Sequence, residues 1–148
     1  MLWQKAPDFQ LQSTNGKIRL ADFRNRWLVL FFYAKNFTPV CNSELIEFNK
    51  HYEKFKKLDA AVLGVSTDEI ESHKKCAREL KLQFPLASDS GKVSREYGVL
   101  NEKLGMAFRG TFVINPEGVI KYIVVSDLGT GRSVKEILRV LKALQTGG

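Results

Sequence analysis

The sequence predicts a single α/β domain in which a mixed central sheet has helices on both faces. Two apolar runs, Trp27 to Tyr33 and Ala60 to Val65, have the length and composition of strands that are buried on both faces. Segments with the apolar spacing of helices follow each run. The 148 residues are enough for one domain with a substantial core, and no stretch is rich enough in Pro, Gly or Ser to form a linker. We therefore treat residues 1–148 as one domain.

Two helices are expected after these two strands. The first is predicted by apolar residues at intervals of three and four, namely Leu45, Phe48, Tyr52 and Phe55. Thr67 or Asp68 can cap the second helix, because Asp68 and Glu71 stand at the spacing of a capping box, and the pattern runs to Leu80. The apolar stripe of this second helix is predicted to contain Ile70, Ala77 and Leu80.

The second half of the chain predicts a short helix and then a hairpin. The helix covers Val93 to Tyr97 and is stopped by Gly98. Two strands, Gly110 to Ile114 and Val119 to Val125, are joined by the turn signal Asn115-Pro-Glu-Gly118.

A capping box opens the last predicted helix, where Ser133 precedes Glu136 by three positions. Its expected core stripe is Val134, Ile137, Leu138, Leu141 and Leu144. A strand, a crossover helix and a parallel strand followed by a closing hairpin and helix form the thioredoxin-like arrangement. This fold alone does not identify a function.

Composition and charge argue against several classes of protein. The net charge of +7 could attract an anionic partner, but no nucleic-acid motif accompanies it and its longest cluster is only Lys54 to Lys57, so we expect a solvated basic surface. The longest apolar run, Trp27 to Ala34, is far shorter than the roughly 20 residues that a bilayer crossing needs. The start, Met1 to Lys5, lacks the apolar core of a signal peptide. We expect a cytoplasmic protein that binds neither nucleic acid nor membranes.

The two cysteines, Cys41 and Cys76, are too few for a disulfide-stapled scaffold, so they serve either packing or chemistry. Cys41 lies just after the first buried strand, and Pro39 suits the first position of a helix. The free N–H groups and the dipole of a first helical turn stabilise a thiolate. The alternative is a buried structural cysteine. Position alone does not decide between the two.

Several motifs together resemble the peroxiredoxins, the alkyl hydroperoxide reductase/thiol-specific antioxidant family, over roughly residues 6–145. Thr38-Pro-Val-Cys41 with Glu44 is similar to their active-site signature. The segment from Phe32 to Cys41 looks most like the bacterioferritin-comigratory, or Q-type, branch. The same branch is matched by Ser72-His73, Phe84-Pro85-Leu86 and Ser88-Asp89. The segment Arg109-Gly-Thr-Phe-Val-Ile114 is similar to the family segment that carries an active-site arginine. The segment from Asp127 to Val134 is more similar to the typical two-cysteine members.

The resemblance implies a thiol peroxidase with an assigned role for each matching residue. Cys41 would attack the peroxide, Thr38 would orient it, and Arg109 would favour the thiolate and stabilise the departing oxygen. Without the resemblance, Thr38 could be a simple helix cap and Arg109 could form a surface ion pair. Glu44 would be a partner for an arginine or for the helix backbone, or else an ordinary acidic residue in a first turn.

One position departs from the family pattern. Where the family motif has a proline, four residues before the threonine, this chain has Ala34. Alanine removes the ring that shields the cysteine pocket and adds an N–H donor. We expect a looser, wetter pocket with somewhat faster over-oxidation or slower turnover.

Cys76 is the only internal thiol that could resolve an oxidised Cys41. In some Q-type members the resolving cysteine aligns with Ala77, and a shift of one residue turns a helical side chain by about 100°. Cys76 is therefore either a tentative resolving cysteine or a core residue. His73 could deprotonate Cys76 or share a zinc ion with it, but we expect both His73 and His51 to be solvated helix residues, and we expect no metal site.

The resemblance also implies the partners. A peroxide would be the substrate and thioredoxin or a similar dithiol protein the reductant, with no haem, flavin or metal cofactor. A monomer and a homodimer both remain open, and since no cysteine follows Cys76 we expect no intersubunit disulfide of the typical two-cysteine kind. The rival interpretations are a non-catalytic redox-relay protein, which would need no peroxide cradle, and a disulfide reductase, which would need a CxxC motif that the sequence lacks.

Overall fold

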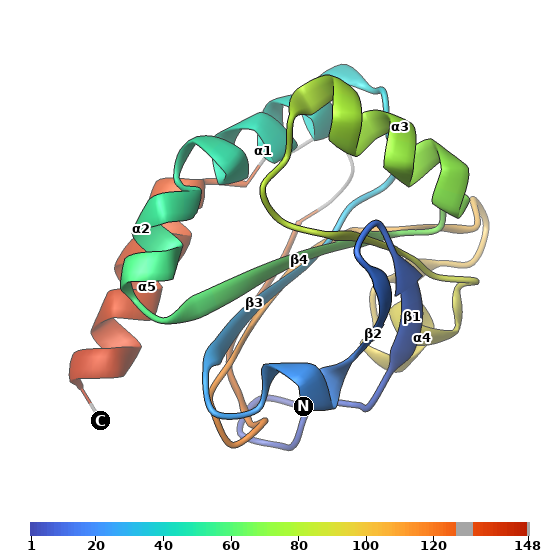
Figure 1. Ribbon diagram of the computed structural model, residues 1–148. Coiled ribbons are helices and arrows are strands. Elements are labelled where there is room, and N and C mark those ends of the chain that lie inside the picture. Colours follow the sequence, from blue (N-terminus) through green and yellow to red (C-terminus); the bar gives the residue numbers. More distant parts are fainter. Residues whose placement is uncertain (127–131, 148) are drawn as a thin grey trace.

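A computed structural model describes residues 1–126 and 132–147 of the chain (Figure 1). Its elements, in chain order, are β1 (Gln10–Ser13), β2 (Gly16–Arg19), the 3-10 helix η1 (Leu20–Phe23), β3 (Trp27–Phe32), α1 (Pro39–Lys50), α2 (Tyr52–Lys57), β4 (Ala60–Ser66), α3 (Ile70–Leu80), β5 (Leu86–Ser88), α4 (Lys92–Glu96), β6 (Leu100–Asn101), β7 (Met106–Ala107), β8 (Arg109–Ile114), β9 (Ile120–Ser126) and α5 (Val134–Thr146).

The large sheet is mixed, as the sequence predicts, with the strand order β2-β1-β5-β4-β3-β8-β9. Its centre is parallel, because β3 pairs with β4 and β4 pairs with β5 in the same direction. The closing hairpin of β8 and β9 adds two antiparallel strands beside β3. Because β3 and β8 are antiparallel neighbours, the last residues of β3 lie beside the first residues of β8.

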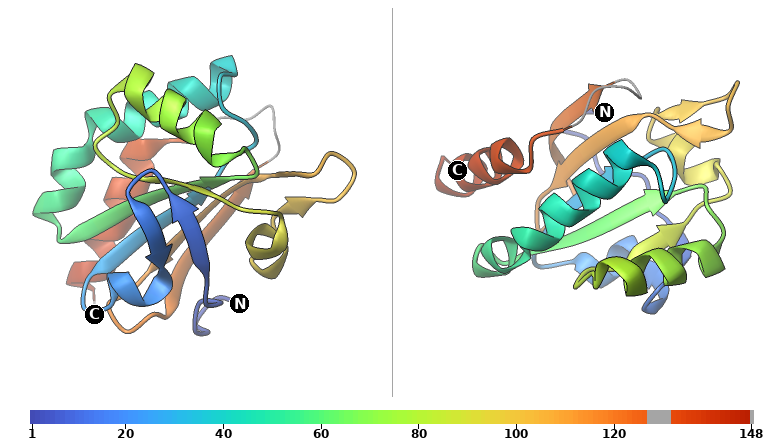
Figure 2. Two further views of the ribbon diagram at one scale, coloured as in Figure 1. Left: turned by 45° about the vertical axis from the view of Figure 1, so that its right-hand side comes forward. Right: turned by 90° about the horizontal axis from the view of Figure 1, so that it is seen from above.

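Helices cover both faces of the sheet (Figure 2). The alternating side chains of β3 enter two separate cores, Leu28, Leu30 and Phe32 one of them and Val29, Phe31 and Tyr33 the other. The second core is closed by α1, α2, α3 and α5, whereas α4, η1 and the N-terminal segment close the first. These layers agree with the fold class expected from the sequence. The expected parallel pair is β3 and β4, which α1 and α2 connect.

Local signals predicted the C-terminal elements well. The Ser133 side chain accepts a hydrogen bond from the Glu136 N–H at 3.2 Å and so caps α5. Gly98 follows the short helix α4 with a positive φ of 73°, which glycine adopts without strain. In α5 Val134, Ile137 and Leu141 are buried as expected, and Val140 joins them.

The predicted first helix is in fact two helices. It is interrupted at His51, which ends α1 and precedes α2, and the Lys54 N–H bonds back to the His51 carbonyl. The start of α3 also differs from expectation, because Glu69 rather than Thr67 or Asp68 is its N-cap. Asp68 accepts hydrogen bonds from Ser66 and Asn36 instead, so its carboxylate is used in tertiary structure.

Short strands at one side of the sheet were not predicted. β1, β2 and β5 have only three or four residues each, and β2 has no buried residue, so their apolar alternation is too brief to recognise. The segment from 127 to 131, part of the predicted similarity to two-cysteine members, lies outside the described residues. No helix among those described combines the length and the apolar character needed to cross a membrane.

Candidate active site

Cys41 is the third residue of α1, in the first helical turn, as the sequence predicts. Pro39 occupies the first position of this helix and Thr38 is its N-cap. The Cys41 side chain is fully buried and belongs to the second core, among Leu45, Phe48 and other apolar residues. The thiol therefore lies beside free helical N–H groups but away from bulk water.

Thr38 caps the helix by position and not through its side chain. Its backbone is extended, and its carbonyl accepts the Asn42 N–H at 2.8 Å. Its hydroxyl makes no capping bond and donates to the Lys35 carbonyl at 3.3 Å. The side chain is half-buried, three residues before Cys41 at the start of the same helix.

Arg109 reaches Cys41 from the first position of β8. Its Nη1 lies 3.4 Å from the Cys41 Sγ and 2.6 Å from Glu44 Oε1. Only 3% of the arginine is exposed, which excludes the surface ion pair that the sequence left open. Because β8 pairs with β3, whose end leads to α1, the sheet itself aligns these two distant segments.

A second arginine, which the sequence analysis did not single out, completes this cluster. The Arg132 main-chain N–H and Nε both donate to Glu44 Oε2, at 2.7 and 3.1 Å. Its Nη1 donates to the Gly110 carbonyl and to the Thr111 hydroxyl. The one signal for it was its place in the segment that resembles two-cysteine members. Glu44 is thus the partner of two arginines, one of the roles expected for it.

Two buried guanidinium groups and one carboxylate lie in the cluster beside Cys41. Among the described residues, Arg109 and Arg132 both form ion pairs with the single carboxylate of Glu44. Burial lowers the pKa of Arg132, which Glu44 counteracts, and a guanidinium remains charged at neutral pH in any case.

Cys76 is the second fully buried cysteine and contributes to the same core. It and His73 are the buried residues of α3, whereas Ile70, placed in the stripe by the sequence, is only half-buried. Burial, followed by the charges of Asp68 and Glu79, raises the pKa of the Cys76 thiol to about 11. Cys76 therefore occupies the core position that was one of its two alternatives, and both cysteines are free thiols.

The expectation that both histidines are solvated was wrong. His73 is fully buried, because it shares the inward face of α3 with Cys76 and both its ring nitrogens have protein partners. His51 is 6% exposed at the joint of α1 and α2, with Nε2 3.5 Å from a Glu47 oxygen. Across residues 1–126 and 132–147, no three His, Cys, Asp or Glu side chains are grouped as metal ligands would be.

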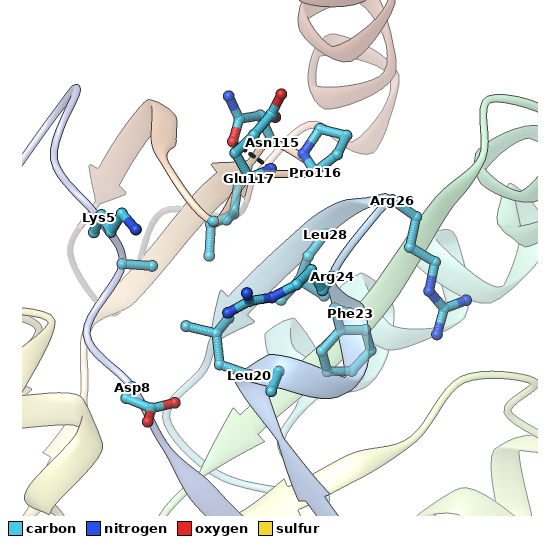
Figure 3. Close-up of a pocket in the computed structure, with 14 residues that line it drawn as sticks. Lys5, Asp8, Leu20, Phe23, Arg24, Arg26, Leu28, Asn115, Pro116 and Glu117 are labelled. Carbon is cyan, nitrogen blue, oxygen red and sulfur yellow. Dashed lines mark hydrogen bonds between the residues drawn. The ribbon is translucent and has the colours of Figure 1, made fainter.

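Two surface hollows differ in their relation to Cys41. One, of about 320 Å³, lies beside the first turns of α1 and is lined by Pro39, Val40, Ser43, Glu44, Glu47 and Arg132. The other, of about 200 Å³, is at the opposite end of β3, where Lys5 and Asp8 lie across from Leu20 and Arg24 (Figure 3). Neither hollow is lined by a cysteine, but the first is lined by Glu44 and Arg132, which form an ion pair in the cluster beside Cys41.

Comparisons with known proteins find relatives in sequence and in structure over most of the chain. Residues 2–123 match the AhpC/TSA family. A peroxiredoxin of Thermoplasma volcanium is 40% identical over 98% of this chain and 75% of its own length. The mitochondrial thioredoxin-dependent peroxide reductase of Drosophila melanogaster is 40% identical over 96% of this chain and 66% of its own length. The crystal structure of Enterococcus faecalis AhpC superimposes with a TM-score of 0.91 at 35% identity, covering 99% of this chain and 94% of that one.

Proposed function

Because the chain belongs to the AhpC/TSA family and is a peroxiredoxin, a thiol-dependent peroxidase, we propose that Cys41 is its peroxidatic residue. The observation that carries this assignment is the contact of 3.4 Å between Arg109 Nη1 and the Cys41 Sγ in the first turn of α1. Cys76 has no comparable cationic partner among the groups that shift its pKa. Of the two thiols, Cys41 is the one placed for nucleophilic chemistry.

In the first step the Cys41 thiolate attacks one oxygen of a hydroperoxide. A sulfur–oxygen bond forms and the oxygen–oxygen bond breaks, so that Cys41 becomes a sulfenic acid and the departing oxygen leaves as water or an alcohol after taking a proton. The Thr38 hydroxyl, at the edge of the site, would orient the peroxide in line with the sulfur. The Arg109 guanidinium would stabilise the charge that develops on the departing oxygen.

Cys76 is proposed to complete the cycle. Its thiol would attack the Cys41 sulfenic acid to form a disulfide and release water. The two cysteines share one core, and Cys41 is close enough to contribute, after burial and two carboxylates, to the raised pKa of Cys76. A disulfide needs Cα atoms within about 7 Å, and a buried thiol with a raised pKa is a weak nucleophile. We therefore propose that α3 and the first turn of α1 shift or partly unwind during this step.

Intact mass after treatment with one equivalent of hydrogen peroxide tests both assignments. The wild-type chain is expected to lose two hydrogens, and the Cys76→Ser variant is expected to gain one or more oxygens instead. A gain of oxygen in both proteins would overturn the role of Cys76 and indicate a one-cysteine mechanism. An unchanged Cys41 in both proteins would overturn the role of Cys41.

A dithiol protein such as thioredoxin is the reductant that this chemistry fits best, since two thiols can open the disulfide and leave as a disulfide themselves. The name of the Drosophila relative supports this choice. We also propose a cytoplasmic location, where a reducing environment keeps both cysteines free. Peroxide consumption coupled to thioredoxin and its reductase, compared with glutathione alone, tests the choice of reductant.

A further inference from the structure

Buried polar side chains connect the turn before Cys41 with β4 and α3. We call this group the His73 network, and it consists of Tyr33, Asn36, Ser66, Asp68 and His73. All except Asp68 are at most 2% exposed. Burying so many hydrogen-bonding groups is unfavourable unless they satisfy one another, so the network has a defined geometry. None of its members takes part in the peroxide chemistry proposed above.

The hydrogen bonds assign the protons of His73. The Tyr33 hydroxyl donates to Asn36 Oδ1 at 2.7 Å, and the Ser66 hydroxyl donates to Asp68 Oδ2 at 2.5 Å. At the histidine, Nδ1 faces the Asn36 amide nitrogen and the Tyr33 hydroxyl, both at 3.2 Å, and because the amide N–H can only donate, Nδ1 accepts. Nε2 lies 3.3 Å from the Ser66 Oγ, whose proton is already used, so Nε2 carries the hydrogen and donates. His73 is therefore a neutral imidazole with one defined tautomer.

Asn36 is the member that holds the active-site turn. Its main-chain N–H donates to Asp68 Oδ2 at 2.9 Å, and its amide nitrogen also donates to the Ser72 hydroxyl at 3.1 Å. The next residue, Phe37, has a positive φ of 64°, a left-handed conformation that costs energy for a side chain of this size. Such a conformation persists only where its surroundings fix it. Thr38 and Cys41 follow directly, so Asn36 fixes the start of the catalytic turn.

We propose that neutral His73 is a positioning residue, which holds the turn from Asn36 to Cys41 against α3 and releases it when the imidazole takes up a proton. A proton on Nδ1 would point at the Asn36 amide nitrogen, which is itself a donor, so the bond to Asn36 must break, and only the Tyr33 hydroxyl oxygen, also 3.2 Å from Nδ1, can accept the new hydrogen. The turn that carries Thr38 would then separate from the helix that carries Cys76. The catalytic meaning of this release rests on the proposed function, whereas the release itself does not.

The groups around His73 determine the direction of the pH effect. Tyr33 faces it from the end of β3, Asn36 from the following turn, and Ser66 and Asp68 from β4 and the connection to α3. Burial lowers the pKa of His73 from 6.5, although the charge of Asp68 acts in the opposite direction. Since the folded state disfavours the proton, the stability that His73 contributes is complete above pH 6.5 and is lost as the pH falls through the lower folded-state pKa.

Hydrogen exchange of the reduced protein, without peroxide, tests this proposal. We would compare pH 7.5 with pH 5.0 for residues 34–42, after correction for the intrinsic exchange rate. In the wild-type protein, the protection factors of these amides are expected to be at least tenfold lower at pH 5.0 than at pH 7.5. In His73→Gln, whose side chain cannot titrate, they should differ by less than twofold. His51→Gln is the matched control, because His51 is also buried but lies outside the network, and it should behave as wild type.

A second variant, Asn36→Asp, tests the proposal even if His73→Gln does not fold. Asn36→Asp supplies a carboxylate that can accept the new Nδ1–H, so residues 34–42 should stay protected at pH 5.0. The proposal would be overturned if the wild-type protein had the same protection at both pH values. It would also be overturned if every variant lost protection at pH 5.0 to the same extent. Because no peroxide is used, either result leaves the assignment of Cys41 as the peroxidatic residue unaffected.

Discussion

Cys41 and Cys76 are both fully buried and pack into the same core, yet a guanidinium contacts Cys41 whereas carboxylates act on Cys76. Arg109 touches the Cys41 sulfur, and Arg132 reaches the same cluster through Glu44. The charges that act on Cys76 come from Asp68 and Glu79, which add to the effect of burial and raise the pKa of the thiol to about 11.

This difference shows that burial alone does not determine the chemistry of a cysteine. Removal from water disfavours a thiolate at both positions. A helix N-terminus and buried guanidinium groups can offset that cost, and only Cys41 has them. Cys76 lies in the second half of α3, away from the helix N-terminus. No cation is among the groups that shift its pKa. The four predictions below test this contrast between the two thiols.

The replacement of either cysteine should separate the two roles most strongly. Cys41→Ser is expected to lower the rate of peroxide reduction by about 10³-fold or more, because the nucleophile is lost. Cys76→Ser should leave the first oxidation step within about twofold of wild type, since this thiol acts only afterwards. Stopped-flow measurement with stoichiometric hydrogen peroxide separates the steps. A slow first step in Cys76→Ser would contradict the contrast.

Loss of the guanidinium at Arg109 should have the next largest effect. Arg109→Met is expected to slow peroxide reduction by about 10²-fold, in the range found when one charged donor is removed from a transition state. Arg109→Lys is the matched control, because it keeps the charge without the planar donor group, and its loss should be smaller. Equal rates for wild type and Arg109→Met would show that the contact with Cys41 has no catalytic role.

The pKa of Cys76 predicts how its alkylation depends on pH. In the Cys41→Ser variant, the reaction of Cys76 with iodoacetamide should accelerate about tenfold for each unit between pH 8 and pH 10, and level off near 11, because only the thiolate reacts. Circular dichroism at each pH would verify that the protein stays folded. A plateau below pH 9 would mean that Cys76 is ionised as readily as an ordinary thiol.

The smallest effect is expected at Ala34, which is half-buried against the core that holds Cys41. Ala34→Pro should restore the shielding ring expected from the family pattern and reduce over-oxidation of Cys41 by about twofold. The measurement is the peroxide concentration at which half of the activity is lost during turnover. No change in either that concentration or the peroxide rate would remove the role that we assign to Ala34.

The sequence predicted those parts of the site that depend on neighbouring residues. The buried strand, Pro39 and Cys41 lie within a few positions of one another, so a strand and a helix start could be recognised together. Arg109 and Glu44 were selected only through the resemblance to a family, because their contact joins residues 65 positions apart. Physical pattern alone would have left both as ordinary charged residues.

The features that were missed depend on tertiary contacts. Arg132 meets Glu44 across 88 positions of sequence, and no local rule indicates such a pair. His73 was expected in solvent because no metal-ligand spacing or other motif assigned it a partner, yet it is buried, and Asn36 and Ser66 satisfy its ring nitrogens. A helical pattern marks which residues are apolar, but it does not show which polar residues find partners inside the protein.

Trapping of the sulfenic acid is the most direct test of the contrast between the two cysteines. The Cys76→Ser protein would be treated with one equivalent of hydrogen peroxide in the presence of dimedone and mapped by peptide mass spectrometry, with Cys41→Ser treated in parallel. We predict a dimedone adduct on Cys41 in the first protein and none on Cys76 in the second. An adduct on Cys76, or an unmodified Cys41, would contradict the assignment.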